Sequence, residues 1–130
     1  MEDNPTDVFV IKEVLEACGL NLGLHVSTNG QEALIFLKAL VEDPHAACPV
    51  LVLLDLNLPK VTGIEVFRQL RAARCSHTPV IVVTSSSAEP DLYIAQQLGA
   101  AGYFQKPTTL VEYMELATLI KRVLDTGAKP

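Results

Sequence analysis

The sequence predicts an α/β domain built on a parallel, doubly wound sheet, and three observations carry that prediction. Two apolar runs, 50–54 and 79–83, have the composition expected of strands that are buried on both faces. Segments with apolar residues at three- and four-residue spacing alternate with these runs, which indicates helices between the strands. The chain has 130 residues, which is enough for one domain with a core of its own.

Helical spacing, caps and glycines place the elements of the first half of the chain. In order, these are a helix over 7–18, a short strand over 24–27, a helix over 30–42 and a strand over 50–54. The first helix is predicted from the spacing of Val8, Ile11 and Leu15, and Gly19 ends it. Asn29 can cap the second helix, and a loop leads from that helix to the next strand.

The second half of the chain repeats the alternation of helix and strand. In order, it holds a helix over 62–73, a strand over 79–83, a helix over 89–98, a short strand over 101–104 and a helix over 109–125. Pro59 and Gly63 mark an exposed loop before the first of these helices, and Gly99 closes the second. Because strands and helices alternate throughout, we expect a parallel sheet with helices on its faces.

Charge and composition exclude several classes of function. The net charge of −5 argues against nonspecific binding to nucleic acid or to an anionic membrane surface. No apolar run reaches the length of a membrane span, and the acidic start is unlike a signal peptide, so we expect a cytoplasmic protein. Cys18, Cys48 and Cys75 are odd in number and lack C-x-x-C spacing, which favours reduced thiols over a disulfide framework or a zinc site.

Polar side chains follow three of the predicted strands at the points where the strands end. Asp55 follows the strand 50–54, Thr84 follows the strand 79–83 and Lys106 comes just after the last strand, while the acidic pair Glu2 and Asp3 precedes the first helix. Ligands of open α/β sheets bind beyond the carboxyl ends of the strands. Each residue alone is most simply a cap, a turn residue or a solvated charge, but together they suit an anionic group held by Mg²⁺.

The motifs at these positions resemble those of the receiver domains of two-component response regulators. The matching stretches are E-D-N-P at 2–5, L-L-D-L-N-L-P at 53–59, Gly63, V-T-S at 83–85 and K-P at 106–107. The stretch E-D-N-P-T-D-V-F-V-I-K is also similar to stand-alone receivers that partner with phytochrome-type kinases. The resemblance implies a flavodoxin-like, CheY-like sheet with the strand order 2-1-3-4-5.

The resemblance implies a phosphoacceptor and a magnesium site. Asp55 would receive a phosphoryl group from a histidine on a partner kinase or a phosphotransfer protein. Asp3 and Asp55 would bind Mg²⁺ through their carboxylates, the backbone carbonyl of Asn57 would be a third ligand, and Glu2 would act through a water molecule. Phosphoryl transfer needs mainly positioning and charge stabilisation, and oxygen ligands around a divalent cation supply both.

The resemblance also assigns roles to the other two strand ends and to one aromatic residue. Thr84 would donate a hydrogen bond to the phosphoryl group, and Lys106 would form an ion pair with it. Tyr103 stands at the aromatic switch position of the family, where coupling to Thr84 would carry the phosphorylation state to a protein-binding surface. As an ordinary strand aromatic, Tyr103 would instead serve only packing.

One feature departs from the family pattern. Receiver domains have a short apolar strand directly before the acidic pair, whereas this sequence begins at Met1, so we expect the family's first strand to be absent from this chain. The natural start could lie upstream of Met1, the strand 24–27 could pair directly with 50–54, or a second copy in a homo-oligomer could supply the missing strand. In a further variant, Val8–Ile11 forms a strand. A rearranged sheet or an oligomer is the favoured expectation.

The leading functional hypothesis is a single receiver domain over 1–130, without an output domain, that signals through a protein partner. Such a module is not an enzyme beyond its own phosphotransfer and autodephosphorylation. The alternative is a degenerate interaction module that takes no phosphoryl group because its start is truncated. A phosphatase with an aspartyl-phosphate intermediate would need a second Asp two residues after Asp55, and Asn57 at that position argues against it.

Overall fold

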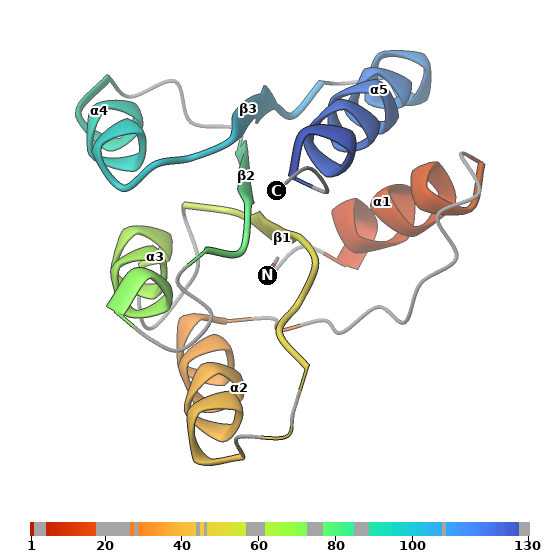
Figure 1. Cartoon of the computed structure of the whole chain (residues 1–130). Coiled ribbons are helices and arrows are strands. Elements are labelled where there is room, and N and C mark those ends of the chain that lie inside the picture. The colour runs from red at the N-terminus through yellow and green to blue at the C-terminus, as the bar shows by residue number, and fades with distance from the viewer. Residues whose placement is uncertain are drawn as a thin grey trace.

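The structure is a computed structural model that describes residues 1, 5–17, 27, 29–43, 45, 47–56, 62–72, 77–84, 89–107 and 109–127. These residues form five helices and three strands: two helices come first, and strands and helices then alternate (Figure 1). They are α1 (Pro5–Ala17), α2 (Gly30–Glu42), β1 (Val52–Leu54), α3 (Gly63–Ala72), β2 (Val80–Thr84), α4 (Glu89–Gln97), β3 (Gly102–Gln105) and α5 (Leu110–Gly127). The predicted α/β class is confirmed.

The described strands form one parallel sheet in the order β1-β2-β3. Strand β2 lies in the centre, and all five of its residues are buried, as its unbroken apolar run predicts. Leu54 of β1 pairs with Val82, and Thr84 at the end of β2 pairs with Gln105 of β3. Because the strands are parallel, their carboxyl ends lie on the same edge of the sheet.

Helices cover both faces of the sheet and bury two separate apolar cores. On one face α2, α3 and α4 pack over Val80 and Val82 around the fully buried Phe67. On the other face α1 and α5 pack over Ile81 and Val83. Figure 1 shows the two groups of helices on opposite sides of the strands. The alternation of side chains along β2 thus divides the molecule into the three layers typical of this architecture.

Local capping explains where two of the helices begin and end. The Asn29 side chain accepts a hydrogen bond of 2.8 Å from the backbone of Glu32, so it caps α2 as predicted. Just after the C-terminal end of α4, Gly99 adopts a φ of 82°, a left-handed conformation that favours glycine. The Arg71 guanidinium donates to the carbonyls of Leu98 and Gly99 over 2.8 and 3.2 Å. Partial burial of this guanidinium lowers its pKa below the ordinary value.

The structure changes two of the strands expected from the sequence and leaves a third one outside the described residues. The strand over 50–54 is shorter than predicted because Val50 is exposed and precedes β1, and the variant in which Val8–Ile11 forms a strand is wrong because these residues lie in α1. The predicted strand over 24–27 lies outside the described residues except for Ser27. Among the described helices, none is both long and apolar enough to cross a bilayer.

The expectation of reduced thiols is wrong for Cys48, which is disulfide-bonded. Cys18 and Cys75 lie outside the described residues. The spacing rule failed here because a disulfide depends on which loops the fold brings together, and sequence spacing does not report that distance.

Met1 lies against the edge of β1 that faces away from β2. Its amino group donates to the carbonyl of Leu53 over 2.8 Å, and its carbonyl accepts from the backbone N–H of Asp55 over 3.1 Å. This is the hydrogen-bond pattern of a residue in a neighbouring parallel strand. In the part of the chain that the structure describes, the sheet has three strands, and Met1 alone pairs with β1 on this side.

Candidate functional site

The buried carboxylate of Asp55 lies directly after β1 and is held by a lysine. Only 5% of the Asp55 side chain is exposed, and the ammonium group of Lys106 lies 2.8 Å from its Oδ2 atom. The Lys106 side chain is itself 9% exposed. Burying a carboxylate is unfavourable unless it is paired and hydrogen-bonded, so this contact compensates a charge that burial would otherwise penalise.

The three predicted strand ends meet at one edge of the sheet. Thr84 is the last residue of β2 and is buried, and its carbonyl accepts a hydrogen bond of 2.9 Å from the backbone N–H of Lys106. This bond ties the segment after β3 to the end of β2, and it places Lys106 where its side chain reaches Asp55. The convergence of Asp55, Thr84 and Lys106 follows from the parallel topology, as expected.

Gly63 allows α3 to begin close to the backbone that carries Asp55. Its N–H donates to the carbonyl of Leu56 over 3.0 Å. A Cβ atom at this position would collide with the backbone of Asp55 and Leu56. The glycine is therefore required by a close approach of two backbones, and α3 in turn supports the turn that follows Asp55. The Thr62 hydroxyl accepts from the N–H of Glu65 and caps the same helix.

Asp7 is a site residue that the sequence analysis missed. Its Oδ2 atom lies 2.9 Å from the Lys106 ammonium group, and its Oδ1 atom accepts a hydrogen bond of 3.2 Å from the hydroxyl of Tyr113. Lys106 therefore contacts two carboxylates, from α1 and from the end of β1. A weak signal in the sequence was available, because Asp7 is an acidic residue in the first turn of α1 and follows the predicted ligand Asp3 by four positions.

The other predicted metal ligands, Glu2, Asp3 and Asn57, lie outside the described residues. Among the residues described, no group of three or more His, Cys, Asp or Glu side chains could hold a metal ion. The carboxylate of Asp55, the one predicted ligand that is described, supplies the hard oxygen atoms that Mg²⁺ prefers. The chemistry of the described part of the site therefore fits the predicted cation, and the ligand set stays a prediction.

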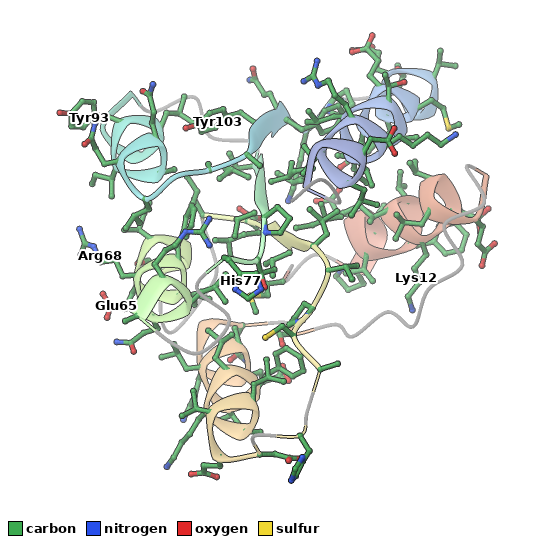
Figure 2. All side chains as sticks on the ribbon, in the orientation of Figure 1. Lys12, Glu65, Arg68, His77, Tyr93 and Tyr103 are labelled. Atoms are coloured by element: carbon green, nitrogen blue, oxygen red, sulfur yellow. The ribbon has the colours of Figure 1, made fainter. Side chains whose placement is uncertain are left out.

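Tyr103 lies on β3 with 42% of its surface exposed. Side chains alternate along a strand, and the pairs Val82–Tyr103 and Thr84–Gln105 put Tyr103 and Thr84 on the same face of the sheet. Figure 2 shows Tyr103 on the side of β3 that carries α4. Partial burial raises the pKa of the Tyr103 phenol. The placement suits the proposed coupling between the two residues, which stays a prediction.

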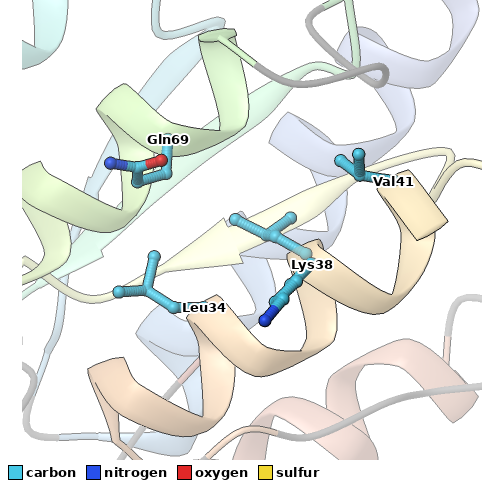
Figure 3. Close-up of a pocket in the computed structure, with 5 residues that line it drawn as sticks. Leu34, Lys38, Val41 and Gln69 are labelled. Atoms are coloured by element: carbon cyan, nitrogen blue, oxygen red, sulfur yellow. The ribbon is translucent and has the colours of Figure 1, made fainter.

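A pocket of about 420 Å³ lies between α2 and α3 (Figure 3). Leu34, Leu37, Lys38 and Val41 of α2 line it together with Gln69 of α3. None of these residues belongs to the group around Asp55. The pocket therefore shares no lining residue with the site at the strand ends.

The chain is similar to known proteins in sequence and in fold. Residues 1–118 match the family model of the response regulator receiver domain. The response regulator Rcp1 of Synechocystis sp. is 31% identical over 117 residues, which cover 89% of this chain and 80% of Rcp1. The crystal structure of the phosphorylated cyanobacterial phytochrome response regulator RcpA superposes with a TM-score of 0.85 at 29% identity, covering 99% of this chain and 93% of RcpA. The crystal structure of the Mn²⁺-bound form of Rcp1 superposes with a TM-score of 0.80 at 30% identity, covering 93% of this chain and 88% of the Rcp1 chain.

The chain therefore belongs to the response regulator receiver domain family. It is a signalling module of two-component systems, and it is similar to phytochrome response regulators. Receiver domains of this family accept phosphoryl groups from histidine kinases and act on downstream partners. The structure of Rcp1 with Mn²⁺ shows that a relative binds a divalent cation.

Proposed function

We propose that the protein takes a phosphoryl group from a phosphohistidine of a partner kinase onto Asp55 and signals this state to another protein. The observation that carries the proposal is the buried ion pair between Asp55 and Lys106, beside the buried Thr84. A carboxylate held at a strand end by an ammonium group suits the role of a nucleophile that attacks phosphorus. Its surroundings supply the positive charge and the hydrogen-bond donor that the transferred group needs.

In the proposed reaction, a carboxylate oxygen of Asp55 forms the new bond to phosphorus while the bond from phosphorus to the histidine nitrogen breaks. Lys106 neutralises part of the charge on the phosphoryl oxygens, and the hydroxyl of Thr84 donates to one of them. Asp3, Asp55 and the carbonyl of Asn57 would hold Mg²⁺, with Glu2 acting through water. The cation would supply further positive charge at the phosphoryl oxygens.

The same proposal covers the partners. We propose a histidine kinase of the phytochrome type, or a phosphotransfer protein, as the donor, because the similar structure of RcpA is that of a cyanobacterial phytochrome response regulator. The output would reach a downstream protein through the face that carries Tyr103. The net charge of −5 supports a protein partner over nucleic acid.

The test is Mg²⁺-dependent labelling by acetyl phosphate, followed by mass spectrometry of the intact protein and of its peptides. One phosphoryl group is expected on Asp55 of the native chain, and none in Asp55→Asn. Asn57→Ala should still be labelled, because only the backbone carbonyl of that residue is assigned a role. Asp125→Asn changes an exposed carboxylate of α5 by the same chemistry and serves as the matched control. Labelling that survives in Asp55→Asn would refute the assignment. A native chain that takes no label favours the degenerate interaction module.

A further inference from the structure

We propose that Asp7 is a competing anion for Lys106, which opposes phosphorylation of Asp55 and links the state of the site to Tyr113 on α5. The inference rests on the proposed function, because it concerns the regulation of the same site. Asp7 itself is a positioning residue, because its contact is with Lys106 and its effect on the phosphoryl group is electrostatic.

The geometry places one ammonium group between two carboxylates. Lys106 Nζ lies 2.9 Å from Asp7 Oδ2 and 2.8 Å from Asp55 Oδ2, and its side chain is 9% exposed. Both contacts have the length of charge-assisted hydrogen bonds. The side chain of Asp7 is 20% exposed, so water screens this pair less than it would screen a surface ion pair. Lys106 is thus shared between α1 and the end of β1.

The charge of the three groups determines the direction of the effect. Two carboxylates and one ammonium group carry a net charge of about −1, and a phosphoryl group on Asp55 would add further negative charge. The Asp7 oxygen can lie no farther from the Asp55 oxygen than the sum of their two distances to Lys106. At this separation, repulsion between Asp7 and the phosphoryl group is substantial in a partly buried site. Asp7 therefore makes phosphorylation less favourable, while it holds the ammonium group beside the phosphoacceptor.

Tyr113 connects Asp7 to α5. The Tyr113 hydroxyl donates to Asp7 Oδ1 over 3.2 Å, and the residue is 4% exposed. Its ring lies against Phe104 of β3, with 5.7 Å between the ring centroids. When the phosphoryl group draws Lys106 toward Asp55, Asp7 shares less of the positive charge of Lys106. The hydroxyl of Tyr113, which donates to Asp7, then meets a carboxylate with a different charge environment. The path from the site to α5 thus runs through side chains that touch one another.

The test compares the affinity of the native chain and of Asp7→Asn for beryllofluoride, which mimics the phosphoryl group, at saturating Mg²⁺. Asn keeps an oxygen that can accept from Tyr113, but it removes the negative charge. We expect Asp7→Asn to reach half-saturation at about tenfold lower beryllofluoride, equivalent to about 1.4 kcal/mol. Asp7→Ser is a second neutral variant, and Asp7→Glu should restore the native affinity. Glu13→Gln removes one exposed charge from the same helix, and its affinity should stay native.

A second measurement follows the ring signal of Tyr113 by NMR, assigned by its loss in Tyr113→Phe. Beryllofluoride should shift this signal in the native chain, and the shift should fall to less than about half in Asp7→Asn because the charge it reports is gone. A merely structural Asp7 would change stability but neither result. Equal or weaker beryllofluoride binding by the folded neutral variants overturns this inference alone. Absence of binding by the native chain and Glu13→Gln overturns the proposed function as well.

Discussion

The ion pair between Lys106 and Asp55 makes a quantitative prediction about stability. Lys106→Met keeps a chain of similar length but removes the ammonium group from two carboxylates that it contacts at 2.8 and 2.9 Å. The carboxylates of Asp55 and Asp7 then lose the cation that they share. At an effective dielectric constant of about 20 and a separation of about 5.5 Å, their repulsion is about 3 kcal/mol.

Removal of one partner of a buried pair typically costs about 3–5 kcal/mol, which agrees with this electrostatic figure. We therefore expect Lys106→Met to lower the free energy of unfolding by about 3–5 kcal/mol, a large part of the about 5–15 kcal/mol of a typical domain. The assay is urea unfolding followed by circular dichroism at neutral pH, with a chelator present so that no divalent cation replaces the lysine.

The double variant Asp55→Asn/Lys106→Met separates charge from packing. If the buried, uncompensated charge of Asp55 causes the loss, the second substitution should recover at least about half of it. A loss below about 1 kcal/mol in Lys106→Met would contradict the reasoning, because a loss of that size is typical of an exposed ion pair. No recovery of stability in the double variant would contradict it as well.

Four further results are expected. Gly63→Ala should destabilise the domain by about 1–3 kcal/mol, because its Cβ would collide with the backbone at Asp55, and it should slow acetyl phosphate labelling; Ala72→Gly, which adds no atoms, is the contrasting variant in both assays. Arg71→Lys should cost about 1.5–3 kcal/mol in urea unfolding, because the three guanidinium nitrogens of Arg71 donate to the carbonyls of Leu98, Thr78 and Gly99, and the single nitrogen of a lysine cannot reach all three positions. Native stability would contradict this role. The raised pKa of Tyr103 means that the folded state keeps a phenol proton that the unfolded state loses, so the contribution of Tyr103 to stability is present below about pH 10 and is lost as pH rises through the folded pKa. In Tyr103→Phe, the free energy of unfolding should therefore fall less steeply above about pH 10 than in the native chain. An unchanged slope would count against the shift. Light scattering should find an oligomer if a second copy adds a strand beside Met1 on β1, whereas a monomer with cooperative unfolding, with and without beryllofluoride, speaks against strand sharing.

Much of the site could be predicted because the parallel sheet makes the link between sequence and space simple. A buried strand in such a sheet reads as an unbroken apolar run, and the residue after it lies on the edge where ligands bind. Asp55 and Thr84 each follow such a run, Lys106 follows the shorter strand β3, and the structure brings the three residues to one edge. The prediction required only the order and the direction of the strands.

The missed residues depend on how helices pack, which the local pattern does not encode. Asp7 reaches Lys106 because α1 lies beside α5 on one face of the sheet, at an angle and a depth that the apolar spacing of α1 leaves open. Arg71 joins α3 to the end of α4 for the same kind of reason. Gly63 was recognised as part of a motif, but its physical role, the close approach to the backbone of Asp55, needs coordinates.

The sequence by itself determined the fold class, the alternation of elements and the edge of the sheet at which polar groups gather, because these follow from periodicity and strand direction along a continuous chain. Only the tertiary structure decided that Lys106 serves two carboxylates and that Tyr113 contacts one of them, because these contacts join residues from α1, β1, β3 and α5. It also decided that Cys48 is disulfide-bonded and that Met1 pairs with β1. Such contacts depend on distances between segments that are remote in the sequence, which only the packed chain determines.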